Sequence, residues 1–260
     1  MHQRRISLVL LCYTAGILVQ AQEPQWLRHY SNNSVNYGFE LASDGSTAVY
    51  GIGTLADATD LFDTSVTVVG DQDIIIARWD TSGNIVWART AGGACEPSDL
   101  DYGSGIHYDV AADQILATGR FTCPGTQFGN LFLSGAGPLS SVQDRFIAAY
   151  STAGDCLWVR RASASGALSI GRSALLTDSD GAIFVVGSCP NSPINFHAAS
   201  ITTVPAGGFI AKYESSGNLI SAERVISNGG LRKAIWANPT EWYLCGYAKP
   251  GAALFTTNLT

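Results

Sequence analysis

Short apolar runs, broken by glycine and by polar turn residues, recur along almost the whole chain. The runs have the length of strands, many alternate with polar residues, and few windows show the spacing of a helix. The chain contains 28 glycines, which punctuate these runs throughout. The pattern predicts an all-β protein built from antiparallel strands joined by tight turns.

Three segments of the sequence align with one another without gaps. Each contains an apolar run, an aromatic residue, a polar turn with glycine at the same place, and a second apolar run, which predicts a β-hairpin. The segments are IIARWDTSGNIVWAR from Ile75, FIAAYSTAGDCLWVR from Phe146 and FIAKYESSGNLISAE from Phe209. Their turn glycines are Gly83, Gly154 and Gly217, at positions where the chain must reverse and positive φ is tolerated.

The second strands of these hairpins differ at one position. Trp87 and Trp158 occupy the same point, whereas the third copy has Ser221 there. Because the third copy lacks a large ring to bury, we expect it to pack less tightly at this point.

A second family of segments lies between the hairpins and aligns on a glycine near the end of a strand. Its four members are STAVYGIGTL, QILATGRFTC, AIFVVGSCPN and EWYLCGYAKP, aligned on Gly51, Gly119, Gly187 and Gly246. Together with a short preceding strand, each such segment and its hairpin form one repeat of roughly 65 residues with four strands. The predicted fold is a β-propeller-like array of four-stranded antiparallel blades, with about three and a half repeats.

The repeats extend over residues 35–90, 102–161, 170–224 and 229–260, and the last is incomplete. Gln25–Arg28 resembles Val86–Arg89 and is expected to be a fourth strand without its repeat. Either a small ring closes imperfectly with this strand, or the chain is the front part of a longer protein with more blades. The unfinished last repeat favours the longer protein.

The first residues have the composition of an export signal. Arg4 and Arg5 precede an apolar run from Leu8 to Val19, and Val19-Gln20-Ala21 has small residues where a signal peptidase cleaves. We therefore expect residues 1–21 to be a signal peptide and residues 22–260 to be a secreted or cell-surface repeat domain. The apolar run is shorter than a membrane span, so no transmembrane segment is expected in the mature chain.

Charge and cysteine content narrow the possible partners. The net charge of −6 and the scattered Lys and Arg residues argue against nucleic acid. Removing the leader leaves five cysteines in a compartment where disulfides persist. Strand order places the loop that carries Cys95 and the loop after the strand of Cys123 on the same face of adjoining sheet units, where the two cysteines can form a disulfide; the alternative is that both are small buried apolar residues.

The sequence contains no recognisable catalytic constellation. The four histidines do not have the spacing of metal ligands, and the sequence has no nucleophile-elbow, zincin or phosphate-loop motif. We therefore assign no catalytic, cofactor-binding or metal-binding residue. Enzyme activity stays open, and a protein without enzyme activity is preferred. Calcium is the one cofactor considered, because acidic residues cluster in loops, but solvated turns are the preferred interpretation. These acidic residues are Asp57, Asp60, Asp63, Asp71, Asp73, Asp178 and Asp180.

The repeat units resemble those of bacterial secreted β-propellers of the SBBP type, proteins that often carry a type IX secretion sorting domain. The segment from Ala77 to Trp87 is also similar to the tryptophan-docking repeat of quinoprotein propellers, in which the repeated glycine and tryptophan lock neighbouring blades together. The family itself implies little about biochemical activity. Loops rich in Asp, Asn, Ser and aromatic residues are expected on one face and suit contact with a glycan or protein, so we expect a non-enzymatic binding or structural module for an extracellular glycan or protein. The alternative is an extracellular hydrolase or lyase that acts on polysaccharide across several blades.

Overall fold

The computed structural model describes residues 36–56, 59–61, 64–94, 101–135, 144–166, 168–171, 174–189, 191–197, 201–238 and 241–255. The expected signal peptide and the strand expected at Gln25–Arg28 lie outside these residues. Within them, no helix is long and apolar enough to cross a membrane.

The described chain folds into antiparallel β-sheets, which confirms the predicted all-β class. Three groups of four strands, here called units 1 to 3, each pair in chain order as a meander. Unit 1 contains β1 (Tyr37–Ser43), β2 (Ala48–Leu55), β5 (Asp73–Asp80) and β6 (Ile85–Gly92). Unit 2 contains β7 (Tyr102–Asp109), β8 (Gln114–Phe121), β11 (Asp144–Ser151) and β12 (Cys156–Ala164). Unit 3 contains β13 (Leu175–Thr177), β14 (Ile183–Cys189), β17 (Gly207–Tyr213) and β18 (Leu219–Ile226). The pair β19 (Gly229–Asn238) and β20 (Glu241–Ala248) follows.

A small hairpin is inserted between the second and third strand of each unit. The hairpins are β3 (Thr59–Leu61) with β4 (Thr64–Val66), β9 (Pro124–Phe128) with β10 (Leu131–Ser134), and β15 (Ile194–His197) with β16 (Ile201–Val204). Two of them reach back to the preceding unit, because β9 pairs with β6 and β15 pairs with β12. The prediction of four strands per repeat therefore counted the strands of the meander but missed the two strands of the inserted hairpin. The missed signal was the pair Gly129-Asn130, a turn dipeptide between two apolar runs, with Gly129 at φ +60°.

The strand register corrects one glycine of the repeat. Gly119 lies opposite Phe146 and Gly187 opposite Phe209, but the residue opposite Ile75 is Gly53, two positions beyond Gly51. A Cβ on Gly53 would lie 2.2 Å from the carbonyl oxygen of Tyr37, and one on Gly119 would lie 2.2 Å from that of Tyr102. Gly53 is thus the structural counterpart of Gly119, and the alignment on Gly51 was wrong by two residues.

The other glycines of this family meet the same obstacle. A Cβ on Gly187 would lie 2.4 Å from the Ser169 carbonyl oxygen, and one on Gly246 would lie 1.9 Å from the Gly230 carbonyl oxygen. The recurring glycine therefore lets the second strand pass close to the backbone of the first strand or, in unit 3, of Ser169 before it.

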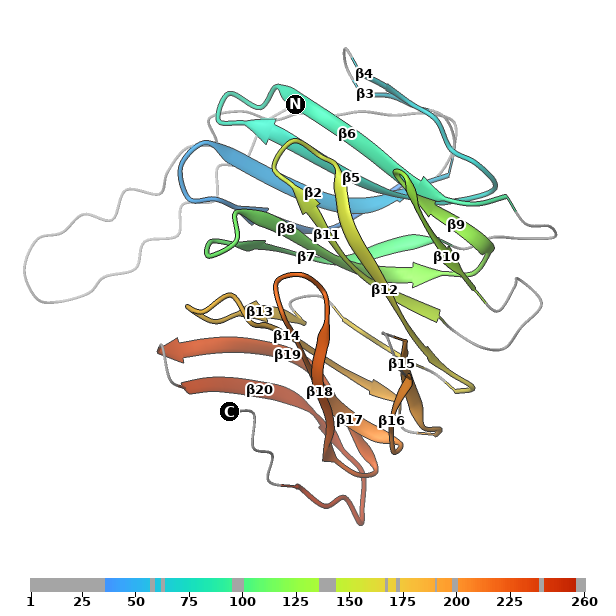
Figure 1. Cartoon of the computed structure of the whole chain (residues 1–260), viewed down its shortest axis with the longest axis vertical. Coiled ribbons are helices and arrows are strands. Elements are labelled where there is room, and N and C mark those ends of the chain that lie inside the picture. Colours follow the sequence, from blue (N-terminus) through green and yellow to red (C-terminus); the bar gives the residue numbers. More distant parts are fainter. Residues whose placement is uncertain are drawn as a thin grey trace, which may run out of the picture.

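The units stack one on the next along the long axis of the molecule, from β1–β6 to β19–β20 (Figure 1). Their first strands contact one another in sequence: β1 with β7, β7 with β13, and β13 with β19. The short turns between the first and second strands and between the third and fourth strands lie at one end of the units, here called the turn end. The inserted hairpins lie at the opposite end (Figure 1).

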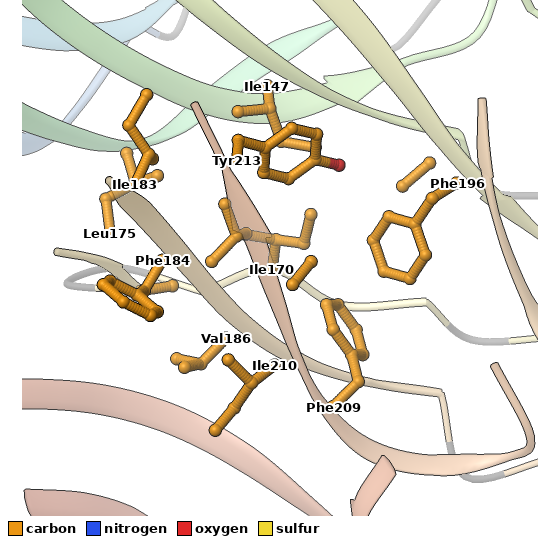
Figure 2. Close-up of a cluster of buried hydrophobic side chains, with 14 of the residues drawn as sticks. Ile147, Ile170, Leu175, Ile183, Phe184, Val186, Phe196, Phe209, Ile210 and Tyr213 are labelled. Carbon is orange, nitrogen blue, oxygen red and sulfur yellow. The ribbon is translucent and has the colours of Figure 1, made fainter. Parts of the chain in front are cut away.

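The hydrophobic core fills the junctions between successive units. One cluster joins units 1 and 2 and includes Tyr50, Ile76, Ile115 and Phe146, all at most 3% exposed. A second joins unit 2 to unit 3 and continues to the β19–β20 pair. Figure 2 shows its side chains, with Ile147 of β11 facing Tyr213 of β17. Because neighbours cover both faces, β8, β11, β14 and β17 are nearly continuous apolar runs.

Candidate functional site

The first junction between units is fixed by a tryptophan that contacts a hairpin turn of the next unit. The Trp87 side chain, only 6% exposed, donates its indole N–H to the Thr152 carbonyl oxygen at 3.0 Å. Its ring lies on Gly154, where an added Cβ would be 2.9 Å away. Gly154 has φ +90° and is itself buried.

The second junction repeats this arrangement. Trp158, also 6% exposed, donates its indole N–H to the Ser215 carbonyl oxygen at 2.8 Å and lies on Gly217. A Cβ on Gly217, whose φ is +80°, would approach the ring to 2.4 Å. Arg160 lies over the same ring at 5.6 Å from its centroid and donates to the Gly217 carbonyl oxygen at 2.8 Å. The turn glycines thus serve two purposes, since they permit positive φ and admit an aromatic ring from the preceding unit.

The third unit carries different residues at these positions. Ser221 and Glu223 stand where unit 2 has Trp158 and Arg160, and both are partly buried. The series of tryptophan contacts therefore stops at β18 in the described chain.

An open groove of about 410 Å³ lies at the turn end, between unit 3 and the β19–β20 pair. It is lined by Thr177, Asp178 and Ser179 of unit 3 and by Trp236, Ala237 and Asn238 of β19. Trp236 and Trp242 lie opposite each other in the pairing of β19 with β20. Both side chains are partly exposed, because the end of this sheet is not fully covered.

The groove tryptophan is held rigidly. The rings of Trp236 and Trp242 stack with centroids 5.6 Å apart and an interplanar angle of 27°. The Trp236 indole N–H donates to the Thr177 carbonyl oxygen at 2.7 Å. Phe184 packs edge-on against Trp236 at 6.2 Å and lies 5.0 Å from Trp242. Three separate contacts therefore fix one ring at the wall of the groove.

The polar wall of the groove is a turn capped by a carboxylate. Asp178 accepts the backbone N–H groups of Asp180 and Ala182 through Oδ1, at 3.0 and 2.8 Å. Its Oδ2 accepts no hydrogen bond from the described residues, and neither does the hydroxyl of Ser179, which is exposed. On the opposite wall, Asn238 donates to Glu241 at 2.7 Å. The groove thus combines an aromatic surface with polar groups of net negative charge.

Trp236 has a counterpart at the first junction. Tyr108 of β7 occupies the strand position of Trp236, and it stacks on Tyr50 with centroids 5.8 Å apart and nearly parallel rings. Its hydroxyl donates to Asp113 at 2.5 Å, which raises the pKa of Tyr108 to about 12. An aromatic residue at this position therefore joins units 1 and 2 and also joins unit 3 to the β19–β20 pair, where the groove lies beside it.

The two described histidines contact hydroxyl groups. His107 Nε2 lies 3.1 Å from Thr177 Oγ1, and His197 Nε2 lies 2.7 Å from Ser163 Oγ. Burial lowers the pKa of both imidazoles, and Arg161 lowers that of His197 further. Ser163 and His197 have the residue types of a nucleophile and its base, but the serine is only 6% exposed. The bond therefore links β12 to β15, to which these residues belong, and does not present a hydroxyl to substrate.

The acidic residues considered for calcium are distributed among several turns. Asp73 is buried and accepts the backbone N–H of Val69 at 2.8 Å, so it holds the loop before β5. Asp178 caps its own turn, as described above. The side chains of Asp57, Asp60 and Asp63 lie outside the described part of the chain. Among the residues that the structure describes, no group of three His, Cys, Asp or Glu side chains is arranged to hold a metal.

The cysteines fall into two groups. Cys123 is fully buried and disulfide-bonded, and its Sγ lies 3.2 Å from the Gly93 carbonyl oxygen. Its partner lies outside the described residues, as does Cys95, so their pairing stays a prediction. Of the described cysteines, Cys156, Cys189 and Cys245 are free thiols.

Sequence reasoning identified Trp87, Trp158 and the turn glycines but missed Trp236 and Trp242. The signal was present: EWYLCG carries Trp242 where the other strands have Val49, Ile115 and Ile183, a bulky residue at a position otherwise filled by aliphatic ones. Trp236 stacks on Trp242 because of the register in which β19 pairs with β20, and the sequence pattern alone did not define that register.

Comparison with known proteins gives a weak similarity to one regulatory protein. No family model matches the chain. The chain is 26% identical over 182 residues to the regulatory protein FlaEY of Caulobacter vibrioides. The match covers 68% of this chain and 17% of that protein, so the chain spans only a small part of its relative.

Proposed function

We propose that this chain is an exported β-propeller-type repeat protein that acts as a non-enzymatic binding module for an extracellular glycan or protein. The observation that carries the proposal is the repeated contact in which Trp87 docks on Gly154 and Trp158 docks on Gly217. These contacts orient unit 2 on unit 1 and unit 3 on unit 2 in the same way, while the first strands of successive units stay in contact. Propeller blades have this relation to one another.

The β19–β20 pair supports the further proposal that another unit packs beyond it. Tyr243 is 66% exposed, whereas Leu116 and Phe184, at the same strand position of units 2 and 3, are at most 4% exposed. Ile235, which lies opposite Tyr243, is 57% exposed. In units 2 and 3 the equivalent positions are covered, so an additional unit of the same kind would bury these two side chains.

The first hairpin turn has the same geometry as the two turns that receive a tryptophan. Gly83 has φ +79° and is buried like Gly154 and Gly217. Since Gln25–Arg28 matches Val86–Arg89 in sequence, we propose that Trp26 stabilises the fold as Trp87 does, in keeping with an SBBP-type repeat pattern of a secreted protein. Replacement of Trp26 by Ala should then lower the unfolding midpoint about as much as replacement of Trp87 by Ala.

The experiment for the function separates binding from catalysis. The exported protein from its natural source is first measured by intact mass, which shows whether further chain follows residue 260. It is then run in gels containing soluble polysaccharides, and the same mixtures are assayed for new reducing ends and for unsaturated products. Retardation without product supports a binding module. Release of product would instead establish the hydrolase or lyase alternative and overturn the proposal.

A further inference from the structure

Resting on the proposed binding function, we infer that the groove beside Trp236 is a glycan subsite that takes one pyranose unit of a neutral, β-linked polysaccharide. The groove joins two features that a sugar requires at one place. These are a flat aromatic surface and hydrogen-bonding groups not already occupied by the protein. Neither comparison with known proteins nor the repeat pattern assigns a ligand to this place.

The aromatic surface suits the apolar face of a sugar ring. A pyranose whose hydroxyls are equatorial exposes its C–H groups on two flat faces, and these pack on an indole as other apolar surfaces do. Trp236 is already immobilised by Trp242, Phe184 and the Thr177 carbonyl oxygen. Binding therefore requires little loss of side-chain freedom, which favours affinity.

The polar wall suits the hydroxyls of the same ring. Asp178 uses Oδ1 to cap its turn, so its position is fixed while Oδ2 faces no hydrogen-bond donor among the described residues. Ser179 adds a hydroxyl that can donate or accept. A pocket with one apolar wall and a few polar groups is the usual composition of a small-molecule site.

Charge selects among glycans. Asp178 lies in the groove, Asp180 follows in the same turn, and Glu241 is hydrogen-bonded to Asn238 on the other wall. The carboxylates of a uronic acid would meet like charges here, whereas neutral sugars would not. The groove volume of about 410 Å³, open to solvent, admits a single ring with its chain continuing outward.

The test uses isothermal titration of the full exported chain with cellohexaose and laminarihexaose as neutral β-linked probes and with hexagalacturonate as the anionic probe. We expect binding of at least one neutral probe and no binding of the anionic one. Trp236→Ala should weaken neutral binding by about tenfold or more, the equivalent of an aromatic stacking contact. Tyr108→Ala is the matched control, because it removes the corresponding aromatic of another junction, and should leave binding unchanged.

A second variant keeps the test valid if Trp236→Ala does not fold. Asp178→Asn retains the capping oxygen but replaces the acceptor at Oδ2 and removes the charge, so neutral binding should weaken severalfold and the discrimination against hexagalacturonate should diminish. Neutral binding that survives both variants would overturn the subsite while leaving the binding module intact. If the protein binds no glycan probe, the subsite is refuted, whereas the proposed function fails only if products appear in the activity assay.

Discussion

The contact between Trp158 and Gly217 offers the sharpest test of how the units are joined. Gly217→Ala adds one methyl group beneath a buried ring, and Gly45→Ala is its matched control. Both glycines have φ +80°, but a Cβ on Gly217 would lie 2.4 Å from Trp158, whereas one on Gly45 would have no atom within 4 Å. The two substitutions therefore share the backbone effect and differ in the contact with the ring.

The expected magnitudes follow from these two effects. An L-residue in the left-handed region costs roughly 1–2 kcal/mol, offset by about 0.4–1 kcal/mol because alanine reduces the freedom of the unfolded chain. Gly45→Ala should thus cost about 1 kcal/mol. Gly217→Ala should cost a further ~2–4 kcal/mol, since overpacking costs about 1–3 kcal/mol and displacement of the ring breaks its hydrogen bond to Ser215, worth about 1 kcal/mol.

The assay is urea unfolding followed by far-ultraviolet circular dichroism, with both variants compared with the unmodified chain. A double-mutant cycle adds Trp158→Leu, in which most of the extra cost of Gly217→Ala should disappear. Free energies of unfolding for Gly217→Ala and Gly45→Ala that agree within about 0.5 kcal/mol would refute the docking contact as a source of stability.

The remaining predictions concern titration and thiol chemistry. Burial lowers the pKa of His107, so the folded state favours the neutral imidazole. The stability that this neutral ring contributes is present above the pKa of the unfolded chain, about 6.5, and is lost as the pH falls below that value. His107→Gln should flatten the decline in unfolding free energy between about pH 7 and pH 5 measured by urea titration, and an unchanged decline would contradict this assignment. Burial raises the pKa of the Cys156 thiol to about 12, so iodoacetamide should label the exposed Cys245 first in the native protein, as followed by peptide mass mapping; equal labelling rates would disprove the difference. Mass mapping without reduction should recover Cys95 and Cys123 as one linked peptide, and a Cys123 peptide linked to any other cysteine would exclude that pairing.

Local sequence patterns determined the strands, the hairpin turns and the repeat. Ile75, Phe146 and Phe209 could be aligned because the turn glycines that follow them obey backbone geometry within a few residues. The inserted hairpins were missed because their strands are short. Gly51 was aligned in place of Gly53 because both glycines lie in the same strand, and only the tertiary structure shows that Gly53 is the one packed against the backbone of β1.

The tertiary structure alone decided what lies between the units. Trp87 and Thr152, or Trp236 and Thr177, are far apart in the sequence and meet only because one sheet stacks on the next. Periodicity reports whether a side chain is buried, but it does not report which partner buries it. The sequence therefore determined the repeating unit, whereas the tryptophan contacts and the groove beside Trp236 arise from the way in which successive units are placed on one another.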